Sequence, residues 1–258
     1  MLQWLRTAGL RSLPIAGFLA LWEGVSRAGI VSEYLFPPPT IVLRALARWA
    51  GTGELWHDIE LSSWRLVAGF LLGGSSAVVL GMVMGRNRYA AAVFGPLFQA
   101  LRALPPVAII PLVIVWLGIG ESAKVFSIAC AVFFPTWINT YLGAQRIPRE
   151  YLWAARILRP SGQGIFWRVL VPATMPSIIA GLRTALALAF VMVYVSEIAG
   201  ASAGLGYRIS IAHLAYRIDL MMAALAVLGT FGALADFAFD LIAHALFPWL
   251  ADKREGAR

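Results

Sequence analysis

The sequence predicts an all-α, polytopic membrane protein with about six transmembrane helices. Hydrophobic residues make up 60% of the 258 residues and charged residues only 13%, so there is too little polar material to cover a surface that faces water. The apolar residues also gather in runs near the length of about 20 residues that a span needs. The 24 glycines and 10 tryptophans agree with this class, because glycine lets spans pack closely and tryptophan suits the headgroup interface.

Charge and cysteine content narrow the functions open to this chain. The formal net charge is +8, but Lys and Arg lie at the ends of apolar runs, so we expect no nucleic-acid partner. The single cysteine, Cys130, lies inside an apolar run, which excludes an intramolecular disulfide and a Cys/His metal cluster. The stretch after Arg6 and Arg11 contains Glu23 and no clear cleavage site, so it is predicted to be a retained first span.

Six apolar runs are candidate spans, near residues 13–30, 63–85, 90–117, 122–143, 176–199 and 220–247. The third contains Pro105, Pro106 and Pro111, each of which removes a backbone donor, and it is predicted to break near Leu104. Since the freed carbonyls need protein or water, the break should face inward. Residues 40–50 are predicted to form a short amphipathic helix along the outer membrane surface.

Positive charge predicts the orientation of the spans. With six spans both termini share one side, and the side richer in Lys and Arg is cytoplasmic. The side of the termini carries Arg6, Arg11, Arg86, Arg88, Arg146, Arg149, Arg156, Arg159, Arg168, Lys253, Arg254 and Arg258. The opposite side carries only Arg44, Arg48, Lys124, Arg208 and Arg217. We therefore expect cytoplasmic termini and a cytoplasmic connection between the fourth and fifth spans.

Small residues repeat every four positions in the second span, at Gly69, Gly73, Ala77, Gly81 and Gly85. Such a ridge lets another helix approach closely. The sequence favours a helix of the same subunit as the neighbour and leaves a second copy as the alternative.

No motif for enzymatic chemistry is present. The sequence has no phosphate-binding loop of the G-x-x-x-x-G-K-[ST] kind, and the stretch "GIGESAK" at 118–124 lacks the glycine before its lysine. His57, His213 and His244 are too scattered for a metal site, and no nucleophile elbow occurs. We expect no catalytic residue, no metal and no directly bound cofactor.

Charge within a span is costly and marks a partner or a cavity, and four of the charged residues in the predicted spans matter most: Arg102, Arg183, Glu197 and Asp236. Arg102, Pro105, Pro106 and Glu197 are the candidates for a translocation pathway. Arg102, beside the predicted break, would attract an anion or form an internal ion pair with Glu197.

Asp236, Asp240 and His244 share one face of the last span. They would form the proton relay of a proton-coupled secondary transporter, or Asp236 would pair with an arginine while the other two reach interfacial water. The second reading is favoured, and the first is retained as the alternative function.

The loop at about 145–175 contains "PREYLWAARILRPSGQGIFWRVLVPATMP", from Pro148 to Pro176. Its first part is predicted to be helical through about Leu158, "RPSGQG" is a turn, and a second short helix at 165–170 ends at Pro172. This predicts a helix-turn-helix on the cytoplasmic surface.

This loop resembles the EAA loop of permease subunits in bacterial ABC importers, through "AARIL", a turn, and "IFWRVLVPATMP". Resemblance to the nitrate/sulfonate/taurine branch comes from "LFPPPTIVLRAL", "SSWRLVAGFLLGGSSAVVLGMVMG", "LRALPPVAIIPLVIVWLGIGESAK" and "GLRTALALAFVMVYVSEIAGASAGLGY", which together cover most of residues 20–220. The resemblance implies a MetI-like type I ABC importer permease fold, with one transmembrane domain over residues 1–258.

The resemblance implies that this loop docks into a cleft on a separate ATPase subunit. The implied contact residues are Glu150, Trp153, Ala154, Ala155, Arg156, Leu158, Arg159, Ser161, Phe166, Trp167, Arg168 and Pro172. Two positions depart from the family pattern, since Trp153 stands in place of its glutamate and Arg159 in place of its glycine. Glu150, one turn before Trp153, would supply the missing carboxylate.

The implied partners are a second permease copy, two cytoplasmic ABC ATPase subunits that hold ATP and Mg, an extracytoplasmic solute-binding protein and the lipid bilayer. The implied location is the bacterial inner membrane. The implied solute is small and anionic, such as a sulfonate, taurine, nitrate, bicarbonate or an aromatic acid.

Overall fold

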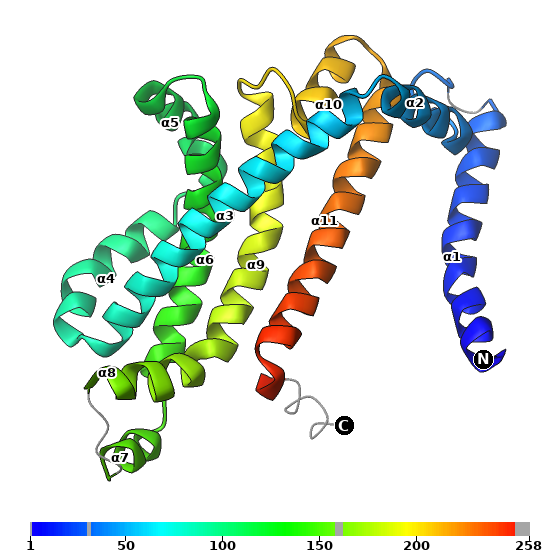
Figure 1. The fold of residues 1–258 in the computed structure, drawn as a ribbon. Helices are drawn as coiled ribbons and strands as arrows, with labels where there is room; N and C mark the ends of the chain where they lie inside the picture. Colours follow the sequence, from blue (N-terminus) through cyan, green and yellow to red (C-terminus); the bar gives the residue numbers. More distant parts are fainter. Residues whose placement is uncertain (1, 30–31, 158–161, 251–258) are drawn as a thin grey trace. The chain divides into compact units, whose positions relative to one another are not determined.

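A computed structural model describes residues 2–29, 32–157 and 162–250, and the described residues are helical without strands. The elements in chain order (Figure 1) are α1 (Leu2–Arg27), α2 (Pro39–Gly51), α3 (Glu54–Arg86), α4 (Arg88–Arg102), η1 (Pro106–Ile109), α5 (Ile110–Leu117), α6 (Glu121–Gln145), α7 (Arg149–Ile157), α8 (Gly162–Ile165), η2 (Phe166–Leu170), α9 (Val171–Ile198), α10 (Leu205–Leu214), α11 (Ile218–Leu246) and η3 (Pro248–Leu250). The prediction of an all-α chain is confirmed.

The number of spans is lower than the six predicted. Within the described ranges four helical segments are long and apolar enough to cross a membrane: Glu54–Arg86, Glu121–Gln145, Phe166–Ile198 and Ile218–Leu246. A fifth arises if α4 and the segment Pro106–Leu117 are counted as one broken span. The predicted span at 13–30 is helical as α1, but its second half carries Glu23 and Arg27, and it is not among these segments.

The predicted break in the third span is confirmed. The chain bends by 92° between α4 and the segment Pro106–Leu117. Pro105 is extended, with φ −60° and ψ 127°, and Pro106 begins η1, as expected where two prolines lack donors to continue a helix. At the break Leu104 and Pro105 are exposed, so the prediction that the break faces inward is not confirmed, whereas Ile110 and Val113 of α5 beyond the bend are buried.

The chain divides into two compact units. The first comprises residues 1–61 and 203–229, and the second comprises residues 62–202 and 230–258. In the first unit Asp58 is buried and accepts hydrogen bonds from the backbone N–H of Gly204 and from the Arg208 guanidinium, at 2.7 and 2.9 Å. The predicted helix at 40–50 is confirmed as α2. A single domain over residues 1–258 stays a prediction.

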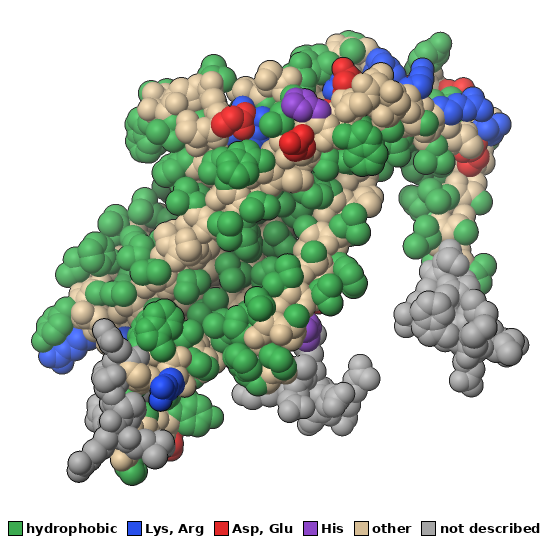
Figure 2. Space-filling view, in the orientation of Figure 1, with side chains coloured by type: hydrophobic (Ala, Val, Ile, Leu, Met, Phe, Trp, Pro, Cys, Tyr) green, Lys and Arg blue, Asp and Glu red, His purple; other side chains and the backbone are tan. Residues whose placement is uncertain are grey.

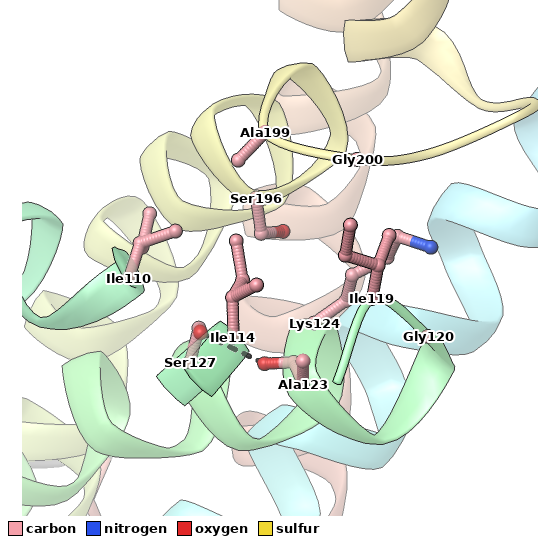
Figure 3. A pocket seen from close by; sticks show the side chains of 10 residues that line it. All are labelled: Ile110, Ile114, Ile119, Gly120, Ala123, Lys124, Ser127, Ser196, Ala199 and Gly200. Carbon is pink, nitrogen blue, oxygen red and sulfur yellow. Dashed lines mark hydrogen bonds between the residues drawn. The ribbon is translucent and has the colours of Figure 1, made fainter. Parts of the chain in front are cut away.

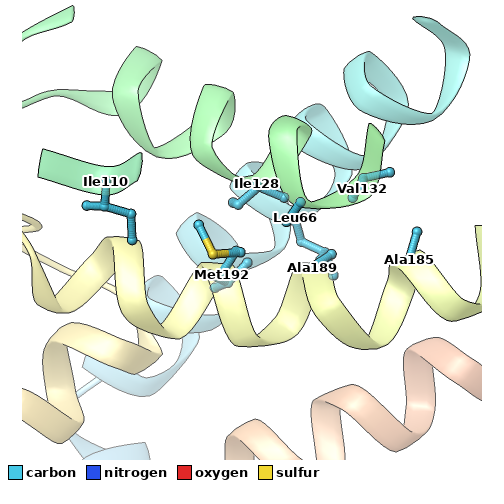
Figure 4. Packing of buried hydrophobic residues seen from close by; sticks show 9 residues of the cluster. Leu66, Ile110, Ile128, Val132, Ala185, Ala189 and Met192 are labelled. Carbon is cyan, nitrogen blue, oxygen red and sulfur yellow. The ribbon is translucent and has the colours of Figure 1, made fainter. Parts of the chain in front are cut away.

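The core of the second unit lies between α3, α6 and α9. Leu66 of α3, Ile128 and Val132 of α6, and Ala189 and Met192 of α9 pack together (Figure 4). On the face seen in Figure 2, hydrophobic side chains cover most of this unit between its helix ends, as contact with lipid requires.

The glycine ridge of α3 packs against α6 of the same chain, as the sequence favoured. A β-carbon at Gly69 would lie 2.6 Å from Ile128, one at Gly81 would lie 2.8 Å from Thr140, and one at Gly73 would overlap the backbone carbonyl oxygen of Ala129. Because these glycines have no side chain, the backbones of α3 and α6 can approach closely.

Gly73→Ala is expected to lower the stability of the folded chain by about 1–3 kcal/mol, because α3 and α6 must separate to admit the methyl group. Gly95→Ala is the matched control, since nothing lies within 4 Å of its β-carbon position and alanine is the better helix former. Thermal unfolding in detergent would measure both. An equal or higher Tm for Gly73→Ala would contradict the close approach.

Candidate functional site

The predicted coupling loop lies where α6 ends and α9 begins, at the opposite end of these helices from α5 (Figure 1). Its first helix is confirmed as α7. Leu158, Arg159 and Ser161 lie outside the described residues, so the predicted turn around them is not seen.

Helix α7 presents an exposed aromatic and aliphatic face. Trp153 and Ile157 lie four residues apart on one face and are both exposed, and Tyr151 is exposed as well. Ala155 is buried. Ala154 and Arg156 belong to the same helix, and Glu150 is exposed in its first turn. At position 153, where the family resemblance implies a glutamate, this helix therefore presents an exposed tryptophan as part of an apolar face.

The second half of the loop corrects the prediction that the short helix ends at Pro172. The chain is helical without interruption from Gly162 to Ile198, through α8, η2 and α9. One π-helical turn, η2, precedes Pro172, and Pro172 occupies the first turn of α9, where its missing N–H is tolerated. Pro176 lies inside α9, and Figure 1 shows the helical path bending between α8 and α9 rather than stopping.

Phe166 and Trp167 are adjacent but point to different surroundings. Phe166 packs against the buried cluster of Met82, Ala144, Ile147 and Leu170. Trp167 is 67% exposed, and Arg168 is exposed beside it. Both aromatic residues were predicted to anchor the loop in a socket, but Phe166 fixes the loop to the chain's own spans and only Trp167 points outward.

Glu197 is fully buried and pairs with Arg65 of α3, not with Arg102. Arg65 Nη1 donates to Glu197 Oε1 at 2.7 Å, and Ser62 Oγ donates to the same oxygen at 2.7 Å. Arg65 also binds Glu121 at the start of α6, through Nε at 2.6 Å and Nη2 at 2.7 Å. A buried guanidinium therefore joins α3, α6 and α9.

Lys124 extends this network, donating from Nζ to Glu121 at 2.9 Å. We call Ser62, Arg65, Glu121, Lys124 and Glu197 the buried ion network. Arg65 was not predicted as a site residue, although its position inside the second predicted span, 63–85, is the signal that identifies it.

Arg102 is exposed at the end of α4, Pro105 is exposed in the bend, and Pro106 is half-buried. Within the part of the chain that the structure describes, Arg102 forms no ion pair. The structure therefore does not bring Arg102 and Glu197 together.

A small cavity lies beside the buried ion network, between α5, α6 and α9 (Figure 3). Ile110 and Ile114 line it with Lys124, Ser127 and Ser196. Its volume of about 10 Å³ suits about one water molecule. In this conformation the cavity is too small for an organic solute.

The polar stripe of α11 is held by an arginine of α9. Arg183 Nη1 donates to Asp240 at 2.9 Å and Arg183 Nη2 donates to Asp236 at 3.0 Å. His244 Nδ1 lies 2.7 Å from the backbone oxygen of Asp240. The predicted pairing of Asp236 with an arginine is confirmed, and Asp240 shares that arginine.

Residues 77–252 match the family model described as "Binding-protein-dependent transport system inner membrane component". The chain is 36% identical to the putative aliphatic sulfonates transport permease protein SsuC of Escherichia coli (strain K12), over 96% of this chain and 94% of the relative. It is 27% identical to the taurine transport system permease protein TauC of the same organism, over 91% of this chain and 87% of the relative.

Solved structures show the same fold. The inward-facing MetNI methionine ABC transporter matches with a TM-score of 0.58 at 21% identity, over 77% of this chain and 97% of that chain. An amino acid ABC transporter crystallised with histidines matches with a TM-score of 0.58 at 15% identity, over 79% of this chain and 97% of that chain. Both matches place the described helices in a MetI-like type I arrangement.

Proposed function

Because the chain belongs to the family of binding-protein-dependent transport system inner membrane components, it is a permease subunit of an ABC importer, and we propose that it carries a small organosulfonate. The subunit is a multi-pass membrane protein whose ATPase is a separate partner and whose solute arrives on a binding protein. The relatives named for sulfonates and taurine support the solute class. The proton-coupled alternative built on Asp236, Asp240 and His244 is not supported.

Coupling to the ATPase is assigned to α7, α8 and η2. The observation that carries this proposal is the outward position of Trp153, Ile157 and Trp167 on a segment whose Phe166 is packed against the spans. Exposed aromatic side chains next to a firmly packed anchor are typical of an interface centre. The outward surface would enter the ATPase cleft while Phe166 passes its displacement to the spans.

The replacement of the family glutamate by Trp153 changes the chemistry of the coupling contact. The socket on the partner should be more apolar than a cleft that receives a carboxylate, with a cation near Glu150 to meet the remaining negative charge. Of the twelve coupling residues implied by the family resemblance, Phe166 is packed against the spans and Ala155 is buried; the others, including the undescribed Leu158, Arg159 and Ser161, are proposed to belong to this contact.

The assembly follows from the type of importer. Two identical permease copies, each a single domain, would flank the pathway, with two ATPase subunits holding ATP and Mg at the cytoplasmic face, where both termini also lie. Arg102, Pro105 and Pro106 would line the pathway at the bend, and Glu197 would support it through the buried ion network.

The function is tested by reconstituting the chain with its ATPase and binding protein in proteoliposomes. Vanadate-sensitive uptake of a labelled alkanesulfonate is the expected result. Uptake driven by a proton gradient without ATP would contradict the assignment. Alkane carboxylates and nitrate are added as competing solutes. Uptake by a specific sulfonate importer should be inhibited by unlabelled sulfonates and not by these other anions.

A further inference from the structure

A pocket in the first unit lies between α2, α10 and the first turns of α3 and α11. Its volume of about 170 Å³ is more than ten times the roughly 10–15 Å³ that one water molecule needs. The residues that line it include Arg48, Trp49, Thr52, Glu54, Arg208 and Arg217. In Figure 2, basic and acidic side chains gather near α2. None of the lining residues belongs to the coupling loop or to the buried ion network.

Two arginines of this pocket share one carboxylate. Arg48 Nη2 and Arg217 Nη2 donate to the same oxygen of Asp219, at 3.3 and 3.2 Å. Both arginines are exposed. Within the described ranges the Arg217 side chain makes no other hydrogen bond, and Nη1 of Arg48 makes none. This part of the pocket therefore keeps one positive charge in excess and free N–H groups for an oxyanion.

The opposite charge is in excess around Arg208. Its guanidinium binds two carboxylates, Glu54 at 3.0 Å and the buried Asp58 at 2.8 Å. By ordinary protonation at neutral pH these three groups carry a net charge of about −1. Glu54 is exposed, so its carboxylate can also meet a cation from outside the chain. The pocket thus combines a positive part and a negative part, which suits a zwitterion better than a simple anion.

The pocket lies at the depth of the lipid headgroups. Both α3 and α11 are long and apolar enough to cross a membrane, and Glu54 and Asp219 lie in their first turns. The ends of spans mark the boundary between hydrocarbon and water. Leu214 and Tyr216, just before Arg217, are exposed, and Tyr216 has a φ of 53°, a conformation that favours glycine. An exposed tyrosine beside an exposed leucine is typical of the headgroup layer.

We propose that this pocket binds the phosphoethanolamine headgroup of a membrane phospholipid. Arg48 and Arg217 hold the phosphate, because guanidinium groups form paired hydrogen bonds with phosphate oxygens. Glu54 receives the ammonium group. A bound headgroup would join α2 to the start of α11, as in other basic pockets between spans that bind lipid headgroups. The proposal depends on the chain spanning a membrane and not on the solute that it carries.

Native mass spectrometry of the delipidated permease tests this binding, with dihexanoyl phosphatidylethanolamine as the probe. In a variant that combines Arg48→Gln and Arg217→Gln, we expect the affinity for this lipid to fall at least about tenfold, because the phosphate loses both charged donors. Arg44→Gln is the matched control. Arg44 is exposed on α2 one turn before Arg48 and does not line the pocket, so its loss should leave the affinity unchanged. Equal loss in Arg44→Gln, or unchanged affinity in the double variant, would overturn the proposal.

Two further probes identify the ligand. Dihexanoyl phosphatidylglycerol has the same phosphate and acyl chains but no ammonium group, so it should bind more weakly, and Glu54→Gln should abolish this difference. Equal binding of the two lipids to the unaltered chain would contradict the contact with Glu54. Glycerophosphoethanolamine carries the headgroup without acyl chains. If it binds as tightly as the lipid, the pocket is a site for a water-soluble zwitterion and the lipid is the wrong ligand.

Thr52→Trp covers the case in which the double arginine variant does not fold. Thr52 is exposed and lines the pocket, so a tryptophan there should fill the space without altering any charge. We expect the lipid affinity to fall while the Tm in detergent is retained. Unchanged lipid affinity with weaker binding of the solute-binding protein would assign the pocket to that protein and would refute the lipid site.

Discussion

Arg65→Met is expected to destabilise the permease by about 3–5 kcal/mol, the cost of leaving a buried partner charge without its ion pair. Glu197 is fully buried and would lose its guanidinium, while Ser62 would still donate to it. The same substitution removes the Arg65 contacts to Glu121 at the start of α6 and leaves Glu121 paired with Lys124. We therefore expect a Tm drop of several degrees in detergent and reduced yield of the folded chain.

Two further variants separate loss of the ion pair from loss of a positive charge. Arg88→Met removes an arginine that is exposed at the start of α4 and should leave the Tm unchanged. Arg65→Met combined with Glu197→Met should recover most of the loss, because two apolar side chains can replace a buried ion pair at little cost. If Arg65→Met alone has the Tm of the unaltered chain, the buried ion network does not hold α3, α6 and α9 together.

Trp153→Ala combined with Trp167→Ala is expected to weaken binding of the ATPase subunit by about 1,000-fold, since central aromatic residues contribute about 2 kcal/mol each. The spans should remain folded, because both side chains point away from the core. The affinity of the ATPase subunit would be measured on permease that is immobilised in nanodiscs. ATP-driven uptake of the solute should fall in parallel.

Trp116→Ala is the matched control for this experiment. Trp116 is 66% exposed, almost the same fraction as Trp167, but lies in α5 at the opposite end of α6 and α9. Loss of the same size in Trp116→Ala would indicate a general effect of removing exposed tryptophans. Unchanged ATPase affinity in the double variant would contradict the placement of the coupling surface.

The features that could be predicted from the sequence depend on residues close together in the chain. Pro105 and Pro106 lack backbone donors, so the break in the third span is visible in the sequence alone. The four-residue spacing of Gly69, Gly73 and Gly81 predicted a close helix neighbour, and the structure supplies it as α6. In both cases the signal lies within one helical segment.

Long-range pairing and helix continuity could not be predicted in the same way. Arg65 and Glu197 are 132 positions apart, and no local pattern selects Arg65 over Arg102 as the partner. Pro172 was expected to end a helix, but a π-helical turn before it allows the helix to continue. The first predicted span, at 13–30, is helical but is not among the segments apolar enough to cross a membrane, because Glu23 and Arg27 lower its hydropathy.

The unbroken helical path from η2 through α9 links the proposed ATPase-binding surface to the buried ion network. With 28 residues, α9 is about 42 Å long, so a tilt of about 10° at its base would displace its tip by about 7 Å. That tip carries Glu197, and through it Arg65 and Glu121. Under the proposed coupling, α9 would act as a lever whose long arm converts a small rotation near the ATPase into a large displacement of the buried ion network.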